Sequence, residues 1–166
     1  VNQTINYTWE DLSELLNSGV EYAAIALGDN KDREKMYYEL NNIGFIVPNI
    51  VHSSSHIDES VKMKRGNHIC MGVCIAVSAF IGDNNIIYSG SILEHESSIG
   101  NNVFIAPGCC IAGRVDIGDN TFIGIGAKVI DNIVIGKNVI IGAGSVILTD
   151  VPDNAIVAGA PAKCVK

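Results

Sequence analysis

Residues 99–147 read IGNNVFIAPGCCIAGRVDIGDNTFIGIGAKVIDNIVIGKNVIIGAGSVI. In this stretch an isoleucine or valine returns at every sixth position. The same period extends back to Val51 without a slip in register, and its members are Val51, Ile57, Met63, Ile69, Ile75, Ile81, Ile87, Leu93, Ile99, Ile105, Ile111, Ile117, Ile123, Val129, Ile135, Ile141 and Ile147. Neither the period of a helix nor the alternation of a strand produces a period of six. A chain that turns a corner after every short strand does, so the sequence predicts a solenoid.

Two other positions of the six-residue unit support this prediction. The residue after the aliphatic is often glycine, as in Gly100 and Gly118, and we expect it at a tight bend with positive φ. Asparagine and aspartate follow and tolerate the same conformation. The fifth position holds small or branched side chains, which we expect to point inward: Ala79, Ser91, Val103, Thr121, Ala127 and Ser145. Three strands per turn then give nearly six turns of a parallel β-helix, with strands about 4.8 Å apart.

The segments on either side of the repeat are different in kind. Residues 1–50 read as part of an α/β domain, the tail of a parallel-sheet unit. Thr8 and Asp11 form a capping-box pattern at the start of its first helix. The expected elements are a helix over Trp9–Asn17, a strand over Val20–Leu27, a helix over Lys31–Asn42 and a short strand over Phe45–Val47. Residues 51–152 form the predicted β-helix, and residues 153–166 are expected to cap its open end.

Composition limits the function classes. The chain has 166 residues, 48% of them hydrophobic and 17% charged, which is typical of a globular protein. A net charge of −7 without a basic stripe argues against nucleic-acid binding. No apolar run approaches the ~18 residues of a membrane span. An odd number of cysteines, five, indicates reduced thiols and a cytoplasmic protein. The first residue is Val1, not Met, which leaves open whether native residues precede it.

The triplet Glu94-His95-Glu96 is the exception to an otherwise regular repeat. With 18 residues per turn, Gly113 lies directly above His95. A neutral imidazole can act as a general base, and a neighbouring carboxylate can orient it if the chain turns a corner there. An exposed glycine N–H can stabilise an oxyanion. Base and oxyanion donor together suit acyl transfer to an amine or hydroxyl.

Two simpler interpretations remain beside this one. His95 can be an ordinary surface residue at a strand edge. A metal centre needs several converging imidazoles or thiolates, and no histidine follows His95 in the chain, so we expect no metal. The other histidines are expected to be solvated or structural, and the cysteines to serve packing. Cations available for a phosphorylated ligand are Arg114, Lys128, Lys137, Lys163 and Lys166.

The repeat, the Glu94-His95-Glu96 triplet, the pairs Ala106-Pro107 and Ala112-Gly113 and the ending DVPDNAIVAGAPAK resemble the sugar acetyltransferases of the left-handed β-helix superfamily. The chain is most similar to the sialic acid O-acetyltransferases and the UDP-4-amino-sugar N-acetyltransferases of bacillosamine synthesis. Residues 1–50 resemble the latter part of their nucleotide-sugar-binding domain. The resemblance implies a left-handed β-helix, acetyl-CoA as co-substrate and a homotrimer with active sites between subunits.

The resemblance also implies residue roles. His95 would be the base, Glu96 the residue that tunes it and Gly113 the donor to the thioester oxygen. Positions implied to line the CoA arm are Ile125, Val134 and Ala143, and Gly28 matches a nucleotide-sugar contact. Phe104 stands where the bacillosamine enzyme has a histidine that touches CoA, and it can pack against pantetheine. Lys163 is a candidate contact for a CoA phosphate.

Two departures bear on the substrate. The glycine-rich strand–turn that opens the family's sugar-nucleotide site does not occur in this sequence. Tyr88-Ser89 occupies a place near the acceptor where many relatives have Asn-Thr, so Tyr88 is a candidate substrate contact. Because this pair differs from that of the relatives, the sequence does not determine which sugar is bound. The sequence also leaves open whether nitrogen or oxygen is acylated.

Alternative functions are a non-catalytic assembly subunit, a carbonic-anhydrase-like metalloenzyme, and a serine or xenobiotic acetyltransferase. A trimer has independent support from apolar side chains at non-core positions of the repeat, which typically mark an interface. These are Cys70, Cys74, Phe80, Ile86, Tyr88 and Phe122.

Overall fold

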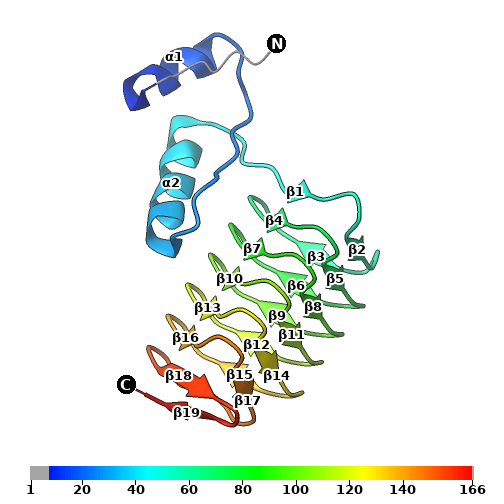
Figure 1. The fold of residues 1–166 in the computed structure, drawn as a ribbon. Coiled ribbons are helices and arrows are strands. Elements are labelled where there is room, and N and C mark those ends of the chain that lie inside the picture. The colour runs from blue at the N-terminus through cyan, green and yellow to red at the C-terminus, as the bar shows by residue number, and fades with distance from the viewer. Residues whose placement is uncertain (1–7, 166) are drawn as a thin grey trace.

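The computed structural model describes residues 8–165 and shows a left-handed parallel β-helix, with one helix beside its coils and a shorter helix farther away beyond it (Figure 1). All but the last two strands are two residues long, and the strands form three sheets that are parallel except for the final strand. The first sheet contains β1 (Ile50–Val51), β4 (His68–Ile69), β7 (Ile86–Ile87), β10 (Phe104–Ile105), β13 (Phe122–Ile123), β16 (Ile140–Ile141), β18 (Ile156–Gly159) and β19 (Ala162–Cys164). The second contains β2 (His56–Ile57), β5 (Cys74–Ile75), β8 (Ile92–Leu93), β11 (Cys110–Ile111), β14 (Lys128–Val129) and β17 (Val146–Ile147). The third contains β3 (Lys62–Met63), β6 (Phe80–Ile81), β9 (Ser98–Ile99), β12 (Asp116–Ile117) and β15 (Val134–Ile135).

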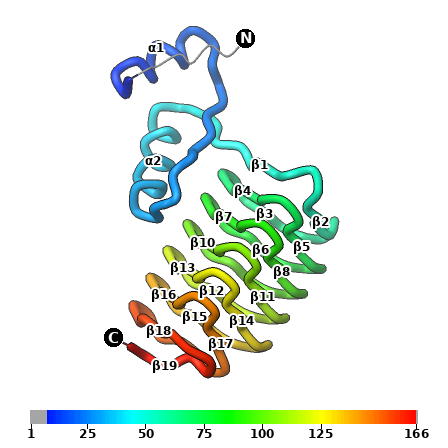
Figure 2. The backbone as a smooth tube through the Cα atoms, in the orientation of Figure 1, coloured from blue at the N-terminus to red at the C-terminus, as the bar shows by residue number. Residues whose placement is uncertain are grey.

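The predicted register is confirmed. Ile87 pairs with Ile105, and Ile105 pairs with Ile123, so each coil advances by 18 residues. Figure 2 shows the coils stacked at a regular spacing. The aliphatic column is buried from Ile69 to Ile147, and the small fifth-position side chains point inward with it. Val51 is exposed, because the first coil has no preceding coil to cover it.

Three kinds of corner connect the sheets. We call them the first corner (from first to second sheet), the second corner (from second to third) and the third corner (from third back to first). At the third corner Asn84, Asn102 and Asn120 adopt the positive φ that the sequence predicts for them.

The prediction for the glycines that follow the aliphatic positions is wrong. Gly100 and Gly118 have no positive φ, and the left-handed residues stand two positions later. A Cβ on Gly118 would lie 2.7 Å from the carbonyl carbon of Gly136, in the next coil. Glycine is needed there because adjacent coils approach too closely for a side chain.

The amino-terminal part is less regular than predicted. A 3-10 turn (Trp9–Asp11) leads into α1 (Leu12–Asn17), and the backbone N–H of Thr8 donates to the Asp11 carboxylate at 2.6 Å. The helix α2 (Asn30–Ile43) confirms the second predicted helix, and Gly44 ends it with a φ of 114°. The strands expected over Val20–Leu27 and Phe45–Val47 are wrong in extent. They meet at a single parallel bridge, between Tyr22 and Ile46, so the segments are extended but form no sheet.

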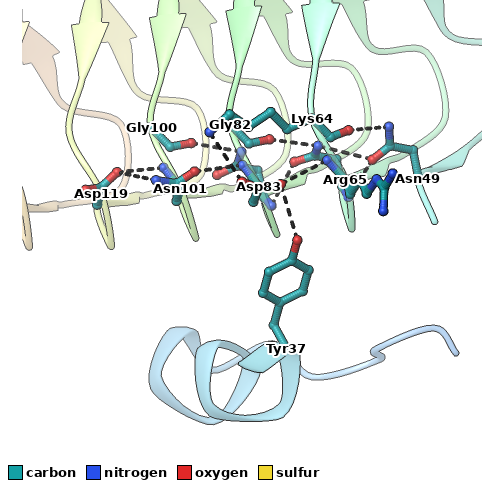
Figure 3. A network of polar contacts seen from close by, with 11 residues as sticks. Tyr37, Asn49, Lys64, Arg65, Gly82, Asp83, Gly100, Asn101 and Asp119 are labelled. Carbon is teal, nitrogen blue, oxygen red and sulfur yellow. Dashed lines mark hydrogen bonds and ion pairs between the residues drawn. The ribbon is translucent and has the colours of Figure 1, made fainter. Parts of the chain in front are cut away.

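The helix α2 packs against the third corner. The Tyr37 hydroxyl donates to Asp83 at 3.2 Å (Figure 3). Burial, together with the nearby Asp83 carboxylate, raises the pKa of Tyr37 to about 12. Asp83 belongs to a ladder in which the side-chain oxygen of one coil accepts the backbone N–H of the coil before it, as Asn101 does for Asp83 and Asp119 does for Asn101. The Tyr37–Asp83 contact thus joins the helix to a residue that the ladder already links to the neighbouring coils.

The carboxyl-terminal segment forms a hairpin on the last coil. Its strand β18 pairs in parallel with β16, and β19 returns antiparallel to it after a cis peptide bond before Pro161. Within residues 8–165, no helix is long and apolar enough to cross a membrane.

Candidate active site

The site begins at the second corner between β8 and β9, where the chain turns through His95 and Glu96. Glu96 has a φ of 59°, which breaks strand alternation and swings its side chain toward the preceding residue. Its Oε2 lies 3.1 Å from His95 Nδ1. The corner required for a carboxylate partner of the histidine is therefore present.

Gly113 lies on the coil above, as the 18-residue register predicts. The amide N–H of Arg114 donates to the His95 carbonyl at 2.9 Å. A Cβ on Gly113 would lie 2.6 Å from both Cε1 and Nε2 of His95, so the imidazole ring rests on the glycine. Gly113 is buried as a residue, because the His95 ring covers the place where a side chain would stand. The Gly113 N–H donates to no atom of residues 8–165.

The contacts of the His95 ring determine what it can do chemically. Its side chain is 41% exposed, and its Nε2 makes no hydrogen bond within the described chain. A carboxylate on Nδ1 favours the tautomer with the proton on Nδ1, which leaves the Nε2 lone pair available as a base. The ring, the carboxylate and the adjoining amide thus form a compact arrangement at one corner.

Arg114, which the sequence suggests as a cation available to a phosphorylated ligand, belongs instead to this arrangement. Its Nη1 lies 3.7 Å from Glu96 Oε2, and its Nη2 lies 3.7 Å from Asp131 Oδ2. Its Nε donates to the Asn132 side-chain oxygen at 2.8 Å. The spacing of 18 residues between Glu96 and Arg114 is a signal that could have found this contact.

The predicted CoA-lining residues lie elsewhere on the solenoid. Ile125 and Ala143 stack at the first corner, one coil apart, and Ile125 is 57% exposed. Val134 points outward from the third sheet and is 51% exposed. Lys163 is exposed on the terminal hairpin. A single chain therefore does not bring these side chains to His95. Lys166 lies outside the described residues.

Phe104 and Tyr88 belong to an aromatic column on the first sheet. The Phe104 ring stacks on the Phe122 ring, with 5.0 Å between the ring centres, and the centre of the Tyr88 ring lies 5.2 Å from that of Phe104. The guanidinium carbon of Arg33, from α2, lies 6.0 Å from the centre of the Phe104 ring. Phe104 is thus held between the helix and its neighbours in the sheet.

Arg33 is a residue that sequence reasoning missed. It is 1% exposed and donates to the carbonyl oxygens of Gly28, Asn84 and Asn102, as well as to the Asn30 side chain. Burial lowers its pKa to about 10. The sequence around Arg33 does not indicate that this side chain is buried, because its partners Asn84 and Asn102 lie 51 and 69 residues away.

Gly28 lies at the mouth of a groove of about 820 Å³ between the start of α2 and the first sheet. Asp29 caps α2 by accepting the N–H groups of Lys31 and Asp32, and these bonds, led by that from Asp32, lower its pKa. The opposite wall carries Phe122 and Ile140. The solenoid wall therefore presents apolar side chains together with polar ones such as Asn120 and Asn138.

The remaining predicted residues are scattered. Ile86 and Phe122 belong to the first sheet, Cys74 to the second and Phe80 to the third, so the apolar set does not form one face. Lys137 is paired with Asp119 at 3.0 Å. Burial raises the pKa of the Cys109 thiol, in keeping with a packing role. Among residues 8–165, no three His, Cys, Asp or Glu side chains gather in a way that could hold a metal ion.

Comparison with known proteins places this geometry in a family. Residues 78–113 and 114–149 match the model for bacterial transferase hexapeptide repeats. A variant of GDP-perosamine N-acetyltransferase from Caulobacter crescentus, solved with CoA and GDP-perosamine, is 33% identical, with a TM-score of 0.94. The match covers 95% of this chain and 75% of that one.

Two further structures agree. The acetyltransferase domain of PglB from Neisseria gonorrhoeae, in complex with acetyl coenzyme A, is 29% identical with a TM-score of 0.87 over 92% of this chain and 76% of that one. WeeI from Acinetobacter baumannii is 28% identical with a TM-score of 0.83 over 86% and 69%. The match to the repeat model, the similar fold and the sequence identity all point to the same family. The chain belongs to the hexapeptide-repeat acetyltransferase family.

Proposed function

We propose that this protein transfers the acetyl group of acetyl-CoA to the amine of a nucleotide-linked amino sugar, with His95 as general base. The observation that carries the proposal is the His95 ring resting on Gly113 with Glu96 at its Nδ1. The similarity to GDP-perosamine N-acetyltransferase favours nitrogen over oxygen as the acceptor atom, and thus favours an amino sugar over sialic acid.

In the proposed reaction His95 Nε2 accepts a proton from the acceptor amine while the nitrogen bonds to the acetyl carbonyl carbon. Glu96 stabilises the imidazolium that forms. The Gly113 N–H, which has no acceptor within the described chain, donates a hydrogen bond to the acetyl carbonyl oxygen as negative charge develops on that oxygen. The carbon–sulfur bond then breaks, and His95 returns the proton to the departing sulfur.

The distribution of the other candidates supports active sites between subunits. His95 stands at the second corner, whereas Ile125 and Ala143 stand at the first. Residues at different corners of one prism face different directions, so they can line one cleft only when a second copy contributes its corner. We therefore assign Ile125, Val134, Ala143 and Lys163 to acetyl-CoA binding in a homotrimer, with Phe104 supporting the surface.

The groove beside Gly28 is the proposed entry for the acceptor. The backbone around Gly28 is exposed, and a nucleotide sugar can lie between it and the wall of Phe122 and Ile140. Tyr88 lies two coils before Phe122, in the same aromatic column. In this scheme residues 1–50 bind the acceptor, residues 51–152 carry the chemistry and residues 153–166 cap the solenoid. An odd number of cysteines, five, suits a cytoplasmic enzyme.

Release of free CoA from acetyl-CoA, measured with GDP- and UDP-linked amino sugars and with sialic acid, tests the proposal. We expect turnover with an amino sugar and a fall in kcat of about 10²–10⁴-fold in His95→Ala, the usual contribution of a general base. His56→Ala is the matched control, because His56 is an exposed histidine of the first coil. Undiminished turnover in His95→Ala, or turnover confined to sialic acid, would show the proposal to be wrong.

A further inference from the structure

We propose that Arg114 is a positioning residue, which holds the Glu96 carboxylate against His95 and offsets the negative charge of that carboxylate. This inference rests on the proposed role of His95 as the base. Arg114 and His95 share a single oxygen, since Glu96 Oε2 lies 3.1 Å from His95 Nδ1 and 3.7 Å from Arg114 Nη1.

The backbone at this corner supports a dedicated role. Glu96 and Arg114 occupy successive left-handed positions, with φ of 59° and 57°. Across the described coils that position is held by glycine or asparagine almost everywhere else, and the one further exception is Ser78. A long side chain at positive φ is conformationally costly, and such residues cluster at functional sites. Here two of them, of opposite charge, flank the same imidazole.

Arg114 is itself held from the other side. Asp131 lies 3.7 Å from Nη2, and the Asn132 side chain accepts a hydrogen bond from Nε at 2.8 Å. The guanidinium is thus oriented by two coils, and Glu96 is restrained through it. Because these side chains are about half exposed, solvent screens each pair and we expect graded effects, not all-or-none ones.

The charges around the ring decide the sign of the effect. Glu96 places a negative charge beside Nδ1, Arg114 places a positive charge against Glu96, and Asp131 places a second negative charge against Arg114. The coil below presents Val77 and Ser78 at this corner, which carry no charge, and Glu94 precedes the ring along the chain. Removing the arginine charge therefore favours protonated His95. Removing the Asp131 charge has the opposite effect, because Arg114 then acts unopposed on the ring.

The experiment compares pH profiles of kcat/KM in the protein of 166 residues. In Arg114→Gln we expect the midpoint of the acid limb to lie at a higher pH than in the wild-type protein, because a positive charge near the base is lost. We also expect kcat to fall about three- to tenfold, with both KM values unchanged within about twofold, since a carboxylate that is no longer restrained orients the base less well. Arg114→Lys should restore the midpoint. Asp131→Asn should move it downward.

Lys35→Gln is the control, since it removes one cation from an exposed pair on α2, with Glu39 at 3.8 Å. The inference would be overturned, and the proposed function would stand, if the Arg114 variants had the same kcat and pH profile as Lys35→Gln while His95→Ala was inactive. An active His95→Ala would instead remove the proposed function. A rise in KM for acetyl-CoA alone would identify Arg114 as a phosphate contact and also overturn the inference. If Arg114→Gln fails to fold, the midpoint of the acid limb in Asp131→Asn tests the inference instead, and an unchanged midpoint would overturn it.

Discussion

Gly113 shows how one residue without a side chain shapes the candidate site. Its φ is not in the left-handed region, so the backbone there would accept alanine without strain. What excludes a side chain is the His95 ring, whose Cε1 and Nε2 occupy the space a Cβ would need. The absence of one methyl group therefore lets the imidazole lie against Gly113 in the next coil, with its Nε2 near the place where a Cβ would stand.

We expect Gly113→Ala to lower kcat at least about tenfold, because the methyl group displaces the ring from its place beside the amide. Thermal unfolding should change little, since the His95 side chain is partly exposed and can move outward. The steady-state assay of CoA release measures the first effect and calorimetry the second.

Gly72→Ala is the control for Gly113→Ala. Gly72 has a φ of 67°, and a Cβ added to it would lie 3.9 Å from its nearest neighbour, so alanine there introduces backbone strain without a clash at the site. We expect about 1 kcal/mol less stability and unchanged kcat. Equal activity of the two variants would refute the role given to the ring position.

At the scale of elements, α2 and the third corner form one unit through Arg33. The guanidinium reaches the carbonyl oxygens of Asn84 and Asn102 on adjacent coils, and the Asn102 side chain donates back to the Asn30 carbonyl at 2.8 Å. Arg33 forms no ion pair with the described residues, so its charge is compensated by carbonyl dipoles and by the face of Phe104. The helix, its capping loop at Asp29 and the groove wall are therefore positioned together.

Arg33→Met should lower the free energy of unfolding by about 2–4 kcal/mol, because it leaves buried carbonyl groups without donors. It should also raise KM for the sugar acceptor several-fold with little change in KM for acetyl-CoA, since the groove loses its support. Urea unfolding and two-substrate kinetics measure these effects. Lys35→Met, on the exposed side of the same helix, should alter neither, and a similar loss in that variant would contradict the role assigned to Arg33.

At the scale of the whole molecule, stability is expected to depend on pH through one histidine that the site does not use. His68 faces outward on β4, half-buried, and its Nε2 is buried without a hydrogen-bond partner in the described structure. Burial, and secondarily the charge of Arg33, lower the pKa of His68 below its ordinary value of 6.5. The folded protein therefore binds this proton less readily than the unfolded chain does.

It follows that stability falls as pH drops through about 6.5, because the unfolded state takes up the proton first. We expect the Tm of the wild-type protein to decrease between pH 7.5 and pH 5, and that of His68→Phe to decrease less. The pKa values of Asp29 and Asp119 are lowered in the folded protein, so these carboxylates lose their contribution to stability only at a lower pH than this window. Parallel Tm curves for the two proteins would contradict this assignment.

The sequence by itself determined the solenoid and its register. A six-residue period leaves one inward side chain per strand, and backbone pairing between coils then requires an 18-residue offset, so His95 and Gly113 could be placed together without coordinates. Local signals also predicted α2, because the residues that begin and end it, Asp29 and Gly44, lie directly beside it in the sequence.

Tertiary structure alone decided the rest. The direction of Glu96 depends on a corner conformation. The burial of Arg33 depends on partners in two adjacent coils, and the place of Arg114 depends on carboxylates from the coils on either side of it. The apolar run Val20–Leu27 reads as a strand, yet it finds a bridging partner only at Tyr22. In each case the deciding interaction joins residues distant in sequence, and no local pattern of residue types records it.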